Sequence, residues 1–134
     1  MPVERVANKT PGAFGSILLG KLIGANMNST ADQLIPLADN PTRYRIRYIV
    51  ATNASISLTT AAGGIYPAVS KGGTAVVGSG QAYSSLTAST LTLDLTLAVA
   101  TTVQTTDALY LSLTTAQGAA ATADFYVYGD VLAD

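Results

Sequence analysis

The stretch that decides the expected fold is Leu91-Thr92-Leu93-Asp94-Leu95-Thr96-Leu97-Ala98-Val99. Its odd-numbered side chains are all aliphatic, and its even-numbered ones are Thr, Asp or Ala. Successive side chains of a strand point to opposite faces, so this alternation predicts a strand with one buried and one polar face. We interpret Asp94, the one carboxylate in the middle of a predicted strand, as part of a solvated strand face.

The same period of two recurs along the chain. Leucines alternate with Tyr, Ser and Thr over 109–114, and Phe125 and Val127 alternate with Tyr126 and Tyr128. Over 43–50, we expect the side chains of Tyr44, Ile46, Tyr48 and Val50 to share one face and those of Arg43, Arg45, Arg47 and Ile49 the other. Further strands are expected over 17–27, 33–37, 56–60, 65–69, 74–77 and 81–86, and no window of twelve residues shows a helical stripe.

Short strands separated by glycine turns predict an all-β fold over residues 16–134, either a β-sandwich or a β-barrel. Residues 1–15 have no clear period and contain Pro2, Pro11 and Gly12, so we expect an extended N-terminal arm. The segment 57–63 is echoed at 112–118. We interpret the two copies as similar hairpins, with a chance match in a Thr- and Ala-rich chain as the alternative.

The residue types argue against catalysis. The chain has no His and no Cys, which removes the commonest general base, the thiolate nucleophile and the favoured zinc ligands. A Ser–His–Asp relay is therefore impossible. A Ser–Lys pair built on Lys9, Lys21 or Lys71 stays formally open, although Ser70 and Lys71 are adjacent and would point to opposite faces of a strand.

Carboxylates lie mostly at predicted loops and strand ends, where Asp is common for turn reasons. An enzyme would have to work with these acidic groups alone. A calcium site made of loop carbonyls with Asp39 or Asp107 stays open, but no Asp-x-Asp-x-Asp-Gly loop is present. We expect no enzyme, no cofactor and no metal.

Composition also limits the partners. Only 11% of the residues are charged and the net charge is −1, so the phosphate neutralisation that nucleic-acid binding needs is missing. No run approaches the ~20 apolar residues of a membrane span, and the N-terminus is not a signal peptide. We expect a protein that is made in a cytoplasm, starts near Met1 and has part of its weakly charged surface covered by a partner.

Two groups of side chains are candidates for that contact. Arg43, Arg45 and Arg47 would stand about 7 Å apart on one strand face, where they meet an acidic partner or form a solvated outer face that also guards a sheet edge. The tyrosines that alternate with core positions would be covered by a neighbouring subunit or by a second sheet. The candidate contact residues are Arg5, Lys9, Arg43, Arg45, Arg47, Tyr110, Tyr126 and Tyr128.

Three stretches, 24–37, 52–66 and 110–129, resemble the small head decoration, or cement, proteins encoded with the head genes of tailed bacteriophages and prophages. The resemblance implies a jelly-roll-like antiparallel β-sandwich, usually a homotrimer, on the outer surface of the virion. Its partner would be the major capsid protein, and its role would be to stabilise contacts between capsomers. It implies no catalytic residues. The alternatives are a tail, fibre or baseplate module, and a carbohydrate-binding module, against which the absence of Trp counts.

Overall fold

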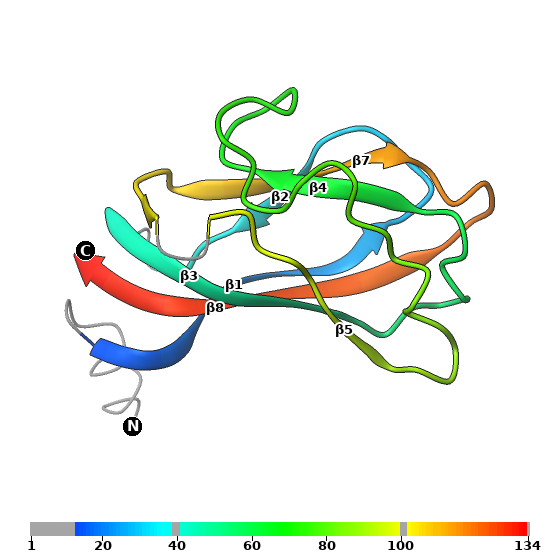
Figure 1. Ribbon diagram of the computed structural model, residues 1–134, viewed down its shortest axis with the longest axis horizontal. Helices are drawn as coiled ribbons and strands as arrows, with labels where there is room; N and C mark the ends of the chain where they lie inside the picture. Colours follow the sequence, from blue (N-terminus) through cyan, green and yellow to red (C-terminus); the bar gives the residue numbers. More distant parts are fainter. Residues whose placement is uncertain (1–12, 39–40, 100–101, 134) are drawn as a thin grey trace.

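The computed structural model describes residues 13–38, 41–99 and 102–133. These residues form strands and connecting segments arranged as two sheets, one above the other (Figure 1). They contain no helix, and hence none long and apolar enough to cross a membrane. The predicted all-β sandwich is confirmed. The expected arm falls almost wholly outside the described residues, and the first strand begins at Ala13.

The larger sheet, sheet A, contains the two longest strands. Its order is β1 (Ala13–Asn26), β8 (Thr122–Ala133), β3 (Arg43–Thr52) and β5 (Thr92–Asp94), with β6 (Val103–Gln104) also paired to β3. Sheet B has the order β2 (Gln33–Pro36), β7 (Ala108–Thr115) and β4 (Ala62–Tyr66). All these pairings are antiparallel.

The core lies between the two sheets. The alternating leucines of β7 and the aromatic and valine positions of β8 are fully buried there, as their period of two predicts: Leu109, Leu111, Leu113, Phe125 and Val127. Tyr83, from the long β4–β5 connection, packs its ring edge-on against Phe125, with 5.8 Å between centroids. Its hydroxyl donates to the carbonyl oxygen of Gly63 at 3.1 Å. Burial raises the pKa of Tyr83 well above its usual value.

The prediction of one long strand over 91–99 is wrong. Of this stretch, only the three residues of β5 pair with β3, and Leu91 is 62% exposed. Leu95 N–H still donates to the carbonyl of Ile49 in β3, but beyond it the backbone bonds elsewhere: Thr96 N–H donates to the side chain of Gln81 and Ala98 N–H donates to the carbonyl of Val76. Leu95 and Val99 are nevertheless buried, because an irregular segment laid over the core also buries alternate side chains.

Three other expected strands are irregular segments: 56–60, 74–77 and 81–86, of which the last two contain isolated bridges at Val77 and Ala82. The two echoed segments are therefore not similar hairpins, since 112–115 lies in β7 while 57–61 is outside any strand. They do lie side by side. Gln117 accepts the backbone N–H groups of Thr60 and Ala61 at 3.0 Å each.

A β-bulge in β3 overturns the predicted faces of the arginine strand. Ile46 pairs with Gly129 but Tyr48 pairs with Tyr128, so Arg47 is an extra residue on β3. The buried positions change phase there, from Tyr44 and Ile46 to Ile49 and Ala51. Tyr48 was predicted to share a face with Tyr44 and Ile46, but it is 41% exposed. An extra residue in one strand leaves two consecutive side chains on the same face, here Arg47 and Tyr48.

Position 129, opposite the bulge, requires glycine because the backbones of β8 and β3 approach each other closely there. A Cβ atom at this position would collide with the carbonyl oxygen of Arg45 and crowd the side chain of Leu19. Glycine permits such an approach because it has no side chain.

Candidate protein-contact face

The candidate site is the face of sheet A that points away from sheet B, called face A below. Inward residues of β8 fill the core, so the alternate residues Tyr126, Tyr128 and Asp130 point outward. Residues directly opposite each other on paired strands share a face, which extends the set onto β1, β3 and β5. By this register face A includes Leu18, Lys21, Arg45, Tyr48, Val50, Asp94, Tyr126, Tyr128 and Asp130. Arg43 and Arg47 join it by alternation along β3, because each follows or precedes a buried residue, Tyr44 or Ile46.

Register arranges these side chains in rows across the strands. One row runs Lys21, Tyr126, Val50, Asp94 over β1, β8, β3 and β5. The next row runs Leu18, Tyr128, Tyr48. In the third, Asp130 of β8 is opposite Arg45 of β3. Face A therefore has an apolar and aromatic centre with charged groups around it.

The aromatic centre is a stacked tyrosine pair. The rings of Tyr48 and Tyr128 are nearly parallel, at 19°, with centroids 4.9 Å apart. A pair of this kind contributes about 0.5–1.5 kcal/mol beyond the area that it buries. Tyr48 and its row neighbour Leu18 are 41% and 37% exposed, so apolar surface stays open to solvent. It continues around the β1 edge into a shallow hollow of about 330 Å³ lined by Leu18, Ile23 and Leu37, among others.

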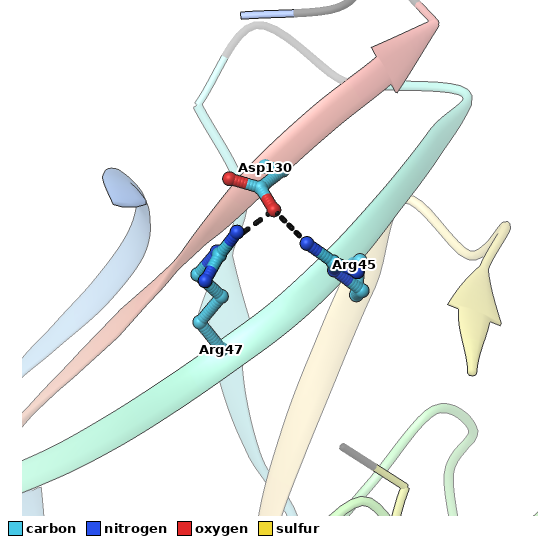
Figure 2. A network of polar contacts seen from close by, with 3 residues as sticks. All are labelled: Arg45, Arg47 and Asp130. Atoms are coloured by element: carbon cyan, nitrogen blue, oxygen red, sulfur yellow. Dashed lines mark hydrogen bonds and ion pairs between the residues drawn. The ribbon is translucent and has the colours of Figure 1, made fainter. Parts of the chain in front are cut away.

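The charged end of face A is a cluster of two arginines on one carboxylate (Figure 2). Arg45 Nη2 donates to Asp130 Oδ2 at 2.6 Å, and Arg47 Nε donates to the same oxygen at 2.8 Å. The Asp130 side chain is fully buried, whereas those of Arg45 and Arg47 are 33% and 43% exposed. The bulge is what allows this, because it turns Arg47 toward the same partner as Arg45.

This cluster has more positive than negative charge. Two guanidinium groups face one carboxylate, and Arg45 Nε is buried without a hydrogen-bond partner. Arg43 is a further exposed cation on the same strand. Guanidinium groups are enriched at protein contacts because their planar fork matches carboxylates and stacks on aromatic rings.

The structure brings together five of the eight candidate contact residues: Arg43, Arg45, Arg47, Tyr126 and Tyr128. Tyr110 lies elsewhere, on the outward side of sheet B between Leu34 and Tyr66. Arg5 and Lys9 lie outside the described residues. Six of the residues named for face A were missed as contact residues: Leu18, Lys21, Tyr48, Val50, Asp94 and Asp130. Asp130 continues the alternation of Tyr126 and Tyr128, a signal that could have found it.

A second polar cluster lies on sheet B and involves a Ser–Lys contact. Lys71 Nζ donates to Ser112 Oγ of β7 at 2.9 Å, so its partner is not the adjacent Ser70. Ser112 is fully buried, which keeps its hydroxyl out of reach of a substrate.

The same lysine belongs to a turn over 69–72 in which Gly72 N–H donates to the carbonyl of Val69 at 3.0 Å. Ser70 and Lys71 have positive φ values of 58° and 56°, which matches a type I′ turn. Asp32 holds the turn by accepting the Ser70 N–H at 2.7 Å. The pKa of Asp32 is lowered by this bond first, then by the Ser112 hydroxyl and the Lys71 charge. The contacts explain the Ser–Lys pair as an anchor for a strained turn.

Among the described residues, no group of three or more Asp, Glu, His or Cys side chains is placed to hold a metal ion. Of the two candidate calcium aspartates, Asp107 is exposed in the loop before β7, and Asp39 lies outside the described residues.

No protein-family model, no curated protein sequence and no solved structure matches this chain.

Proposed function

We propose that this protein is a non-catalytic structural protein of a tailed-phage head, a decoration protein that binds the outer capsid surface and stabilises contacts between capsomers. The observation that carries the proposal is face A. It presents exposed Tyr and Leu side chains beside an arginine cluster, on a rigid sheet.

The composition of face A favours a protein partner. Tyrosine and arginine are enriched where proteins meet, because they bury much area at little entropic cost and still form hydrogen bonds. Sheet A holds these side chains in place before any contact is made, so little ordering entropy opposes binding. Many copies on one particle would add avidity to modest single contacts.

The strand order supports the finer fold assignment that the proposal includes. Strands β1, β8 and β3 face β2, β7 and β4, so the chain crosses between the sheets as it does in a jelly roll. We infer a jelly-roll arrangement whose remaining positions are filled by β5, β6 and the irregular β4–β5 connection. The resemblance of 24–37, 52–66 and 110–129 to decoration proteins points the same way.

Face A is less suited to sugar binding. A carbohydrate-binding module stacks a sugar on an open aromatic face, but Tyr48 and Tyr128 each have one face covered by the other. A tail, fibre or baseplate module would use the same kind of protein contact. Electron microscopy of gold-labelled virions separates it from a head protein by location.

The proposal is tested with heads of the phage or prophage that encodes the chain, prepared without it. We expect the protein to cosediment with these heads and to raise the temperature at which they release DNA. The variant Tyr48→Ser/Tyr128→Ser should lose both effects while keeping its β-sheet circular dichroism. Tyr110→Ser, which removes a tyrosine from sheet B, is the matched control and should bind normally. A wild-type protein that stays in the supernatant would refute the proposal.

A further inference from the structure

We infer that the arginine pair of face A, Arg45 and Arg47, is a docking site for a carboxylate side chain of the capsid protein. The inference rests on the proposed function and names the chemistry of the partner at this end of face A. It narrows the interpretation of the arginine strand, which left an acidic partner and a solvated outer face open.

The two guanidinium groups lie side by side above a carboxylate that solvent does not reach. Arg45 Nη2 and Arg47 Nε both donate to Oδ2 of Asp130, at 2.6 and 2.8 Å (Figure 2). The Asp130 side chain is fully buried, whereas both arginine side chains are a third or more exposed. A group that approaches face A from outside therefore meets guanidinium and not carboxylate.

Much of the hydrogen-bonding capacity of the pair is not used within the described part of the chain. A guanidinium group has five N–H donors in a planar fork. Among the described residues, the side chains of Arg45 and Arg47 each donate one hydrogen bond, to Asp130, and Arg45 Nε is buried without a partner. The donors at the exposed ends suit the two oxygens of a carboxylate, which arginine binds in a bidentate geometry.

The pair is positioned before any partner arrives. Asp130 acts as a positioning residue, because one of its oxygens holds both guanidinium groups. Fixed side chains lose less conformational entropy on binding than free ones. The bulge also puts Arg47 and Tyr48 on the same face, so an aromatic ring lies next to the pair. An acidic side chain with an apolar neighbour fits this arrangement, with its carboxylate on the arginines and its neighbour against Tyr48.

The charges of face A are separated along the strands, which favours a protein partner over nucleic acid. At one end the three arginines of β3 outnumber Asp130. Asp94 and Asp124, the latter outward between buried residues of β8, lie about 13 and 20 Å further along the strand direction. A nucleic acid that lay along the sheet would meet these two carboxylates, which repel phosphates. A single carboxylate on a protein surface needs only the basic end.

Arginine side-chain NMR tests the site in the purified protein, without heads. The probe is hexaglutamate, and hexaglutamine is the uncharged control. We expect the Nε–H signals of Arg45 and Arg47 to shift saturably with hexaglutamate and to stay in place with hexaglutamine. Signals that do not respond to hexaglutamate would overturn the site. A larger response to a single-stranded DNA oligomer of equal charge would overturn the choice of a protein partner.

Head binding tests whether the fork of Arg47 matters beyond its charge. R47Q removes the fork and should weaken binding about 10- to 100-fold, the usual contribution of hydrogen bonds to charged groups. R47K keeps the charge but replaces the fork by a point donor, so it should lose most of the same affinity. Ser79→Glu makes the same change in net charge as R47Q, in a loop that Thr114 of sheet B contacts, and should bind as the wild type does. Circular dichroism checks that each variant is folded.

The outcomes separate this inference from the proposed function. If the wild type binds heads and R47Q or R47K binds equally well, the carboxylate site is overturned and the capsid role stays in place. If hexaglutamate shifts the two arginine signals but the protein never binds heads, the carboxylate site is supported and the capsid role is overturned.

Discussion

Replacing Asp130 by Asn tests whether the arginine cluster stabilises sheet A. The substitution keeps the size of the side chain but removes the charge that accepts bonds from Arg45 and Arg47 at 2.6 and 2.8 Å. Hydrogen bonds to a charged group contribute about 1.5–3 kcal/mol each when they are desolvated. Here the two guanidinium groups are a third or more exposed, and an amide oxygen can still accept one bond from an arginine. We therefore expect D130N to lower the free energy of unfolding by about 2 kcal/mol.

Urea unfolding followed by circular dichroism measures this change. A loss of about 2 kcal/mol moves the midpoint down by about 1 M if the slope is unchanged. R47Q removes only one of the two bonds and should cost about half as much. D107N, at an exposed aspartate outside the cluster, should leave the midpoint unchanged. A D130N midpoint equal to that of the wild type would show that the cluster adds no net stability.

Three further predictions concern other parts of the fold. Gly129→Ala should cost about 3 kcal/mol in urea unfolding, because the new methyl group meets the backbone of Arg45; a neutral result would contradict the close approach at the bulge. The pKa of Asp32 is lowered in the folded state, so its ionised carboxylate stabilises the fold. This stabilisation is complete above the ordinary pKa of 3.8 and is lost as the pH falls through the lower pKa of the folded state. The stability difference between the wild type and Asp32→Ala should therefore close at acid pH, and a constant difference from pH 6 to pH 2 would contradict the role of its charge. Tyr83 has a raised pKa, so its neutral form stabilises the fold below pH 10 and this contribution is lost above it. Tyr83→Phe should cost about 1 kcal/mol at pH 7 by removing the bond to Gly63, and stability should then fall less steeply above pH 10 than in the wild type.

Part of the candidate face could be predicted before any tertiary contact was known. Alternation in β8 places Tyr126 and Tyr128 on the face of the strand that points away from the buried Phe125 and Val127. This outward face is where a partner can bind. The arginines were found because they recur at every second position. Alternation alone could not show that Tyr110 would lie on a different sheet, because that depends on which strands pair.

The bulge could not be predicted, and it decides the geometry of the face. The sequence of β3 alternates without interruption through Arg47 and Tyr48, so nothing local marks an extra residue. The interruption comes from the partner strand, where Gly129 lets the backbone of Arg45 approach closely. Asp130, which joins the arginines, is 85 residues from Arg45 along the chain.

By itself, the sequence determined the class of the fold and the limits on its chemistry. A period of two selects strands because their side chains alternate between faces, and a chain without His or Cys lacks the usual catalytic and zinc-binding groups. Only the tertiary structure decided which alternating segments form strands. Leu95 and Val99 are buried from an irregular segment, because burial requires contact with the core and not a place in a ladder. It also decided which outward side chains share a face, since strand register is set by pairing between distant parts of the chain.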